Sequence, residues 1–183
     1  ASNLCAGTYN VTLTDNRGCF TTTSAIVGTP PLLTTAITAS GNVSCNGFSD
    51  GYAQSTVSGG VAPYSYLWSD NQTGAQAINL GAAMYGLTVT DTNGCMATTS
   101  VTISEPQGMG STTSQNDVSC FGACDGDATV SVGGGTPPYV YLWNDPSFQT
   151  TPTANGLCNG PFGVTITDNN GCIETASVIL SQP

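Results

Sequence analysis

The 183-residue chain contains no histidine and a single cation, Arg17, against eleven acidic residues, so its formal net charge is −10. Nucleic acids and anionic membranes are bound through lysine and arginine side chains that neutralise phosphates, and we expect neither partner here. The missing histidine excludes catalysis by a Ser–His or Cys–His pair. The acidic residues fall on expected turns rather than in a convergent pair. We therefore expect no enzyme activity and no cofactor.

Long hydrophobic runs are also missing. Hydrophobic residues make up 39% of the chain, but they lie in short alternating runs, whereas a membrane-spanning helix needs about 20 consecutive apolar residues. We expect no membrane span in this segment. The first residues also lack the basic and apolar regions of a signal peptide, so export is inferred from the cysteines instead.

Eight cysteines are present and recur in matched frames. Such a set in small units indicates a disulfide framework formed in an oxidising, extracellular compartment. Structural zinc is the alternative interpretation. It is disfavoured because the chain has no Cys-x-x-Cys pair and no histidine, and only Cys120 and Cys124 lie close in sequence.

One phrase of eleven residues occurs three times, as Tyr9–Cys19, Tyr85–Cys95 and Phe162–Cys172. Its closing cysteines are 76 and 77 residues apart, a period the size of a small domain. Two complete copies therefore follow each other, at residues 32–106 and 107–183. Residues 1–31 match only the second half of a copy, so we expect the C-terminal half of a repeat domain there.

Alternation of Val, Ile, Leu or Tyr with Thr or Ser predicts β-strands with one buried face. In the second unit the expected strands are 33–39, 52–58, 63–68, 75–80, 84–90 and 95–103. The predicted fold is all-β, in tandem immunoglobulin-like Greek-key β-sandwich repeats of about 76 residues. A small barrel is the alternative. Trp68 and Trp143 are expected to pack in the cores rather than to serve as sugar platforms.

The cysteine pairs follow from comparing the units. The second unit contains only Cys45 and Cys95, which we expect to pair, and the same frame gives Cys120–Cys172 in the third. Cys124–Cys158 remains as an additional bond, with Ser49 and Gly81 at the corresponding positions. Cys5 and Cys19 are then expected to have partners outside this segment, upstream or on a neighbouring subunit.

Several polar residues have candidate roles. Asp15, Asp91 and Asp168 precede tight turns and are expected to accept hydrogen bonds from the turn backbone. Weak calcium candidates are Asp50, Asp125 and Asp127; otherwise we expect no metal. Of the three glycan acceptor triplets, only the one at Asn71 lies in an expected exposed loop, which makes it a candidate for glycosylation.

The linkers are short and contain proline, at Gly28–Leu32 and Ser104–Gly108. Proline favours an extended backbone and does not extend a strand ladder. Consecutive sandwiches are therefore expected to follow almost end to end, as in a rod.

The segments Val43–Asn46, Asp50–Gly51, Gly59–Trp68 and Thr88–Cys95, and their copies in the third unit, resemble the SprB repeat found in surface adhesins of gliding bacteria. The resemblance implies an exported, surface-anchored protein of many repeats on the bacterial cell surface, used in gliding motility or attachment. It brings no catalytic residues.

Three hypotheses about function follow. The first is a structural and adhesive module that forms the stalk or filament of an adhesin, with neighbouring repeats or identical subunits as partners. The second is a carbohydrate-binding module that stacks a glycan on Tyr64, Tyr66, Tyr139 and Tyr141. The third is an accessory domain of an exported multidomain protein.

Overall fold

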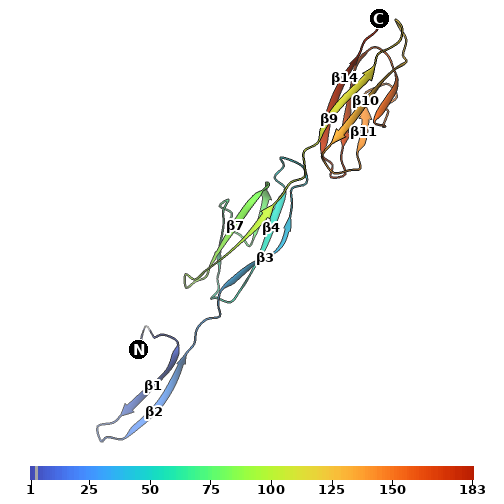
Figure 1. Ribbon diagram of the computed structural model, residues 1–183. Coiled ribbons are helices and arrows are strands. Elements are labelled where there is room, and N and C mark those ends of the chain that lie inside the picture. The colour runs from blue at the N-terminus through green and yellow to red at the C-terminus, as the bar shows by residue number, and fades with distance from the viewer. Residues whose placement is uncertain (3) are drawn as a thin grey trace.

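The structure, a computed structural model, describes residues 1–2 and 4–183. Three β-structured bodies follow one another along the chain, with the N-terminus in the first and the C-terminus in the third (Figure 1). We call them the hairpin, the first sandwich and the second sandwich. The regular structure of the described residues consists of β-strands, and no helix in that part of the chain has the length and apolar character to cross a membrane.

The first sandwich contains two three-stranded antiparallel sheets. One sheet has the order β3-β4-β6, with β3 at Thr34–Gly41, β4 at Gly51–Ser58 and β6 at Gln76–Leu80. The other has the order β5-β7-β8, with β5 at Ser65–Trp68, β7 at Ala83–Thr90 and β8 at Met96–Ile103. These orders equal the A-B-E and C-F-G sheets of an immunoglobulin-type Greek key.

The second sandwich repeats this topology. Its sheets have the orders β12-β10-β9 and β11-β13-β14. The strands are β9 at Gly110–Asn116, β10 at Gly126–Gly133, β11 at Val140–Trp143, β12 at Thr153–Leu157, β13 at Gly160–Thr167 and β14 at Ile173–Leu180. The prediction of tandem immunoglobulin-like sandwiches is confirmed. The alternative prediction of a small barrel is wrong, because the two sheets of each sandwich are not hydrogen-bonded to each other.

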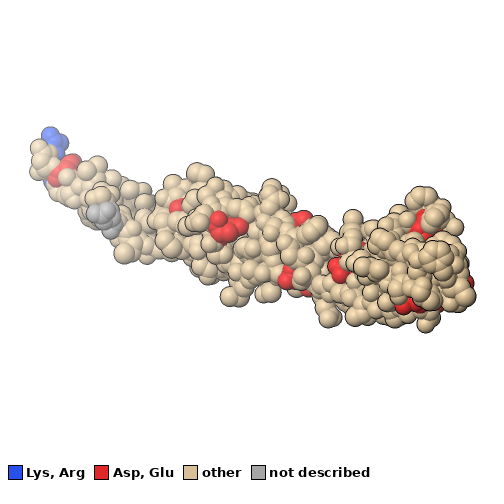
Figure 2. All heavy atoms as spheres, turned by 90° about the horizontal axis from the view of Figure 1, so that it is seen from above, with Lys and Arg blue, Asp and Glu red and all other residues tan. Residues whose placement is uncertain are grey.

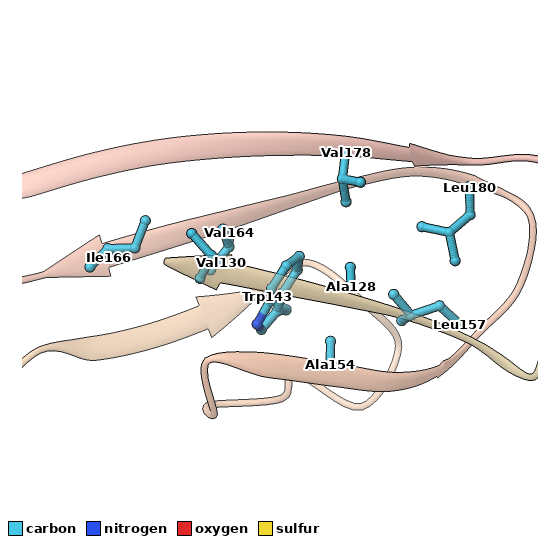
Figure 3. Close-up of a cluster of buried hydrophobic side chains, with 9 residues drawn as sticks. All are labelled: Ala128, Val130, Trp143, Ala154, Leu157, Val164, Ile166, Val178 and Leu180. Atoms are coloured by element: carbon cyan, nitrogen blue, oxygen red, sulfur yellow. The ribbon is translucent and has the colours of Figure 1, made fainter. Parts of the chain in front are cut away.

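Alternating burial explains why these sequences form strands. In β7, Leu87 and Val89 are 1% and 0% exposed, while Thr88 and Thr90, which alternate with them, are half-buried. Each sandwich has one core, in which a tryptophan is the largest side chain. Trp143 lies at the middle of the second core (Figure 3) and is 0% exposed; Trp68 in the first core is 1% exposed. Both tryptophans are therefore core residues, as predicted.

The hairpin has the strand pairing of β7–β8 but no second sheet. Its strands are β1 at Gly7–Thr14 and β2 at Phe20–Val27, paired from Gly7↔Val27 to Thr14↔Phe20. The corresponding pairs in the first sandwich run from Ala83↔Ile103 to Thr90↔Met96. In the hairpin the side chains that match the core residues of β7 remain exposed: Val11 is 59% and Leu13 70% exposed.

Candidate functional site

The two sandwiches meet at a joint, and the base of the second sandwich forms one side of it. By base we mean the end that carries the β13–β14 turn and the Gly134-Gly135 turn. Asp168 connects these two turns. Its Oδ1 accepts the backbone N–H groups of Asn170 and Cys172, both at 2.9 Å. Its Oδ2 accepts the N–H of Thr136 at 2.9 Å, directly after the Gly-Gly turn.

The base of the first sandwich is built in the same way. Asp91 Oδ1 accepts the N–H groups of Asn93 and Cys95 at 2.9 and 2.8 Å, and its Oδ2 accepts the N–H of Val61 at 3.0 Å. In the hairpin, Asp15 Oδ1 likewise accepts two N–H groups of its own turn. The predicted turn role of the three aspartates is confirmed. The sequence did not predict the second bond, which Oδ2 accepts from the backbone N–H that follows the Gly-Gly turn.

The donors around these carboxylates shift their pKa values. Burial alone would raise the pKa of Asp168, but the N–H groups of Cys172 and Thr136, with others of the turn, outweigh burial and hold the pKa below its ordinary value of 3.8. Burial and backbone donors act in the same opposed way at Asp91, and its pKa is also lowered. Both carboxylates are therefore ionised near neutral pH and serve as acceptors.

The linker is fixed against this base. The N–H of Gly135 donates to the carbonyl of Gln107 at 2.8 Å, and the N–H of Gly60 donates to the carbonyl of Pro31 at the same distance in the first sandwich. At Gly134, which has φ +74°, an added Cβ would overlap the carbonyl oxygen of Gly108. The incoming chain therefore lies directly on the Gly-Gly turn.

The top of the first sandwich forms the other side of the joint. By top we mean the end that carries the loop from Val43 to Asp50. The N–H of Val43 donates to the carbonyl of Ser104 at 3.0 Å. Asp50 accepts both the N–H and the hydroxyl of Ser44, and these two bonds lower its pKa. The loop that presents Cys45 is therefore held in place from both sides.

A disulfide crosses the joint between Cys45 at this top and Cys172 at the base, with 5.6 Å between their Cα atoms. The N–H group of the Asn170 side chain donates to the carbonyl of Ser44 at 3.1 Å, also across the joint. The two sandwiches are thus connected by the linker, a covalent bond and a hydrogen bond. Beside them lies a cavity of about 320 Å³, lined among others by Phe48, Met109 and Glu174.

The predicted bonds Cys45–Cys95 and Cys120–Cys172 are wrong; Cys95 and Cys120 are exposed free thiols. Strand β8 separates Cys95 from Ser104, the residue that accepts the N–H of Val43 beside Cys45. Eight residues at about 3.3 Å each span about 26 Å, far beyond the roughly 7 Å that a disulfide allows between Cα atoms. The two cysteines of one sandwich therefore lie at opposite ends.

Cys124 and Cys158 form the other disulfide, within the second sandwich, as the sequence comparison predicts. Cys5 and Cys19 are exposed free thiols among the described residues. Their expected partners outside this segment stay a prediction.

The calcium candidates do not come together. Asp125 accepts from the backbone and hydroxyl of Ser119, as Asp50 does from Ser44. Asp127 faces the Asn116 amide instead. Across residues 1–2 and 4–183, no group of three or more Asp, Glu, Cys or His side chains is placed to hold a metal ion. These three aspartates support the loops through hydrogen bonds.

The four tyrosines proposed to stack a glycan are partly engaged in the fold, and glycan binding stays a prediction. Tyr64 and Tyr139 donate their hydroxyl groups to the carbonyls of Gly59 and Gly134. Together with Tyr66 and Tyr141, their rings are half-buried against the two cores. These tyrosines therefore stabilise the sandwich and its Gly-Gly turn. Asn71 lies exposed between β5 and β6 with φ +72°, and its glycosylation stays a prediction.

Comparison with known proteins gives a family match and a set of distantly similar structures. No curated protein matches the chain. One similar structure is the crystal structure of a tetra-tandem repeat in the extending region of a large adhesion protein, with 13% identity, a TM-score of 0.28, and 98% of this chain and 58% of that chain covered. Extracellular domains 3–5 of Drosophila OTK have 13% identity, a TM-score of 0.31, and coverages of 97% and 71%. This chain spans 58% of the length of the first of these structures.

The family match falls on the first half of each sandwich. The SprB repeat family matches residues 37–73, from β3 into the β5–β6 loop, and residues 112–148, the corresponding part of the second sandwich. Both ranges include the cysteine of the top loop and the tryptophan of the core. Each sandwich therefore contains one region that is similar to the SprB repeat family.

Proposed function

We propose that this chain is a load-bearing length of stalk in an exported adhesin of the bacterial cell surface. In this role the repeats hold a binding region away from the cell and catalyse no reaction. Residues 32–106 and 107–183 are the repeating domains, and residues 1–31 are the C-terminal half of one more. Gliding or attachment is the process that the stalk serves.

The observation that carries this proposal is the disulfide Cys45–Cys172 across the joint. A flexible string of domains needs only its peptide linker. Here the linker lies on the Gly-Gly turn, and a covalent bond ties the top of one sandwich to the base of the next. Two covalent connections at one joint restrict bending, which is what a spacer under load requires. Formation of the bond also requires an oxidising compartment.

The shape and surface of the molecule support the same role. The sandwiches follow one another lengthwise in Figure 1. Figure 2 shows a mostly uncharged surface on the face in view, with scattered acidic residues and basic atoms at the hairpin end only. An elongated surface without a basic patch suits lateral contacts with similar surfaces or a passive spacer, and does not suit binding of polyanions.

The hairpin fits the same repeat array. Its exposed Val11 and Leu13 match residues that the A-B-E-type sheet covers in both sandwiches. We propose that a three-stranded sheet of the same repeat covers this face, supplied by preceding chain or by a neighbouring subunit. A concentration-dependent increase in mass of the chain in solution would assign the sheet to a neighbouring subunit; a monomer at all concentrations would assign it to preceding chain.

The stalk role is tested by negative-stain microscopy of the oxidised chain. We expect straight rods with a narrow distribution of angles between the two sandwiches. The matched variant Cys172→Ser keeps the Cys124–Cys158 bond but opens the joint, and should broaden that distribution. Equal distributions for the two proteins would contradict a stiff stalk. Antibody labelling of intact cells tests export, and labelling only after lysis would overturn it.

A further inference from the structure

Two exposed thiols occupy the positions whose counterparts form the joint. Cys120 lies in the top loop of the second sandwich, where Cys45 lies in the first. Cys95 lies at the base of the first sandwich, where Cys172 lies in the second. Of its top-loop cysteine and its base cysteine, each sandwich thus has one bonded and one free, at opposite ends. The free pair consists of one top and one base cysteine.

The top loop around Cys120 has the same form as the bonded one. Asp125 accepts the N–H and hydroxyl of Ser119 at 3.0 and 2.6 Å, compared with 3.0 and 2.5 Å for Asp50 and Ser44. The N–H of Val118 donates to the carbonyl of Ser181, as that of Val43 does to Ser104. The loop therefore has its joint-forming conformation before any partner is bound.

The base around Cys95 is equally complete. Its N–H donates to Asp91 Oδ1 at 2.8 Å, compared with 2.9 Å for Cys172 and Asp168. Asn93 occupies the position of Asn170, whose side chain donates to the carbonyl of Ser44 across the joint. The N–H of Gly60 in the neighbouring Gly-Gly turn donates to the linker carbonyl of Pro31, as the N–H of Gly135 does to that of Gln107. The base at Cys95 and the top loop at Cys120 thus have the same cysteine and the same neighbouring hydrogen-bonding groups as the two sides of the bonded joint.

We propose that Cys120 and Cys95 are the two halves of further joints, each of which binds another repeat of this kind covalently. Cys120 pairs with the base cysteine of a following repeat, and Cys95 with the top-loop cysteine of a preceding one. Each bond forms when two thiols release two protons and transfer two electrons to an oxidising disulfide, which is reduced to two thiols. Every joint of the array is then closed in the same way. This goes beyond the stalk role, since it specifies the bond and partner at each end.

The test is a lengthened chain in which residues 107–183 are repeated directly after Pro183. This keeps the frame, because Pro183 matches Pro106 in the observed linker. After oxidation with glutathione disulfide, free thiols are alkylated and disulfide-linked peptides are mapped by mass spectrometry. We expect Cys120 to be bonded to Cys172 of the appended copy. The number of alkylated thiols should stay at the four of the original chain, although four cysteines have been added.

A matched control carries Cys172→Ser in the appended copy, and here Cys120 should be alkylated. The Cys124–Cys158 bond of the appended copy reports that it has folded. A second lengthened chain ends in residues 31–106 instead, since Pro31 corresponds to Gln107 in the linker, and in it Cys120 should pair with Cys95 of the appended copy. Alkylation of Cys120 in both lengthened chains, or its pairing with Cys172 of its own sandwich, would overturn the proposal.

Discussion

At the scale of single residues, the aspartate before each Asn-Gly-Cys turn accepts hydrogen bonds from two different turns, one through each carboxylate oxygen. Oδ1 of Asp168 closes the turn that presents Cys172, and Oδ2 holds the backbone after the Gly-Gly turn. Loss of this charge would loosen both turns at once. The joint therefore depends on an ionised side chain that forms no part of the disulfide.

The lowered carboxylate pKa values predict that the protein loses stability in acid. Six aspartates have a pKa below the ordinary value of 3.8: Asp50, Asp91, Asp117, Asp125, Asp145 and Asp168. Because their folded-state pKa is lower than in the unfolded chain, their contribution is complete above about pH 5. It declines as the pH falls through 3.8 towards the folded-state values. The melting temperature, followed by circular dichroism from pH 7 to pH 2, should fall mainly below pH 4.

Asp168→Asn is the control for this pH dependence. An amide does not titrate, and its NH₂ group would face the N–H of Thr136 in place of an acceptor. The variant should melt at a lower temperature at pH 7 and lose less between pH 5 and pH 2 than the unchanged protein. An unchanged slope would show that this carboxylate does not contribute to the acid effect.

Trp143 is the residue on which the core of the second sandwich depends most. It is 0% exposed and donates its indole N–H to the carbonyl of Thr151 at 3.0 Å. We expect Trp143→Ala to lower the free energy of unfolding of this sandwich by about 3–5 kcal/mol, measured by urea titration. Phe148→Ala is the matched control, because Phe148 is 66% exposed and should change the value by less than about 0.5 kcal/mol. Similar losses for both would contradict the assigned core.

At the scale of elements, the strands could be predicted from alternation alone. The six strands expected in the second unit lie within two residues of β3 to β8. The core position of Trp68 followed from the same alternation. The connection of each linker to the Gly-Gly turn could not be predicted, since it depends on which turns the two sheets bring to one end. Local periodicity contains no such information.

The Gly-Gly turn provides a test of this connection. Gly134 has φ +74°, and a Cβ there would overlap the carbonyl oxygen of Gly108 in the linker. Gly134→Ala should therefore destabilise the second sandwich by about 1–3 kcal/mol. The neighbouring Gly133 has no atom within 4 Å of an added Cβ, so Gly133→Ala should be close to neutral. Urea titrations of both variants measure the difference, and equal effects would mean that the linker does not lie on this turn.

At the scale of the whole molecule, the disulfide across the joint shows why comparing the units within the sequence predicts the wrong cysteine pairs. Counting two cysteines in the second unit favoured a bond within it, on the assumption that each domain closes its own bonds. The length of β8 alone places Cys45 and Cys95 at opposite ends. A strand of that length excludes a disulfide between them. The partner in the next repeat could be found only once the tops and bases were known to meet.

The bond across the joint predicts how the chain responds to force. Cys45 and Cys172 are 127 residues apart, so tension applied to the two termini passes through the disulfide and bypasses the residues between them. Reduction should therefore lengthen the fully stretched chain by about 45 nm, at about 3.6 Å per residue. Single-molecule pulling of the chain from its ends, with and without reductant, measures this difference.

Two variants make the result specific to the joint. Cys124 and Cys158 both lie inside the bypassed segment and are 34 residues apart. Cys158→Ser should therefore leave the stretched length of the oxidised chain unchanged. In Cys172→Ser the joint opens while the 34-residue loop stays closed, so the stretched length should increase by about 33 nm. Bonds Cys45–Cys95 and Cys120–Cys172, confined to single sandwiches, would instead give an increase of about 37 nm on reduction and of only about 6 nm in Cys172→Ser.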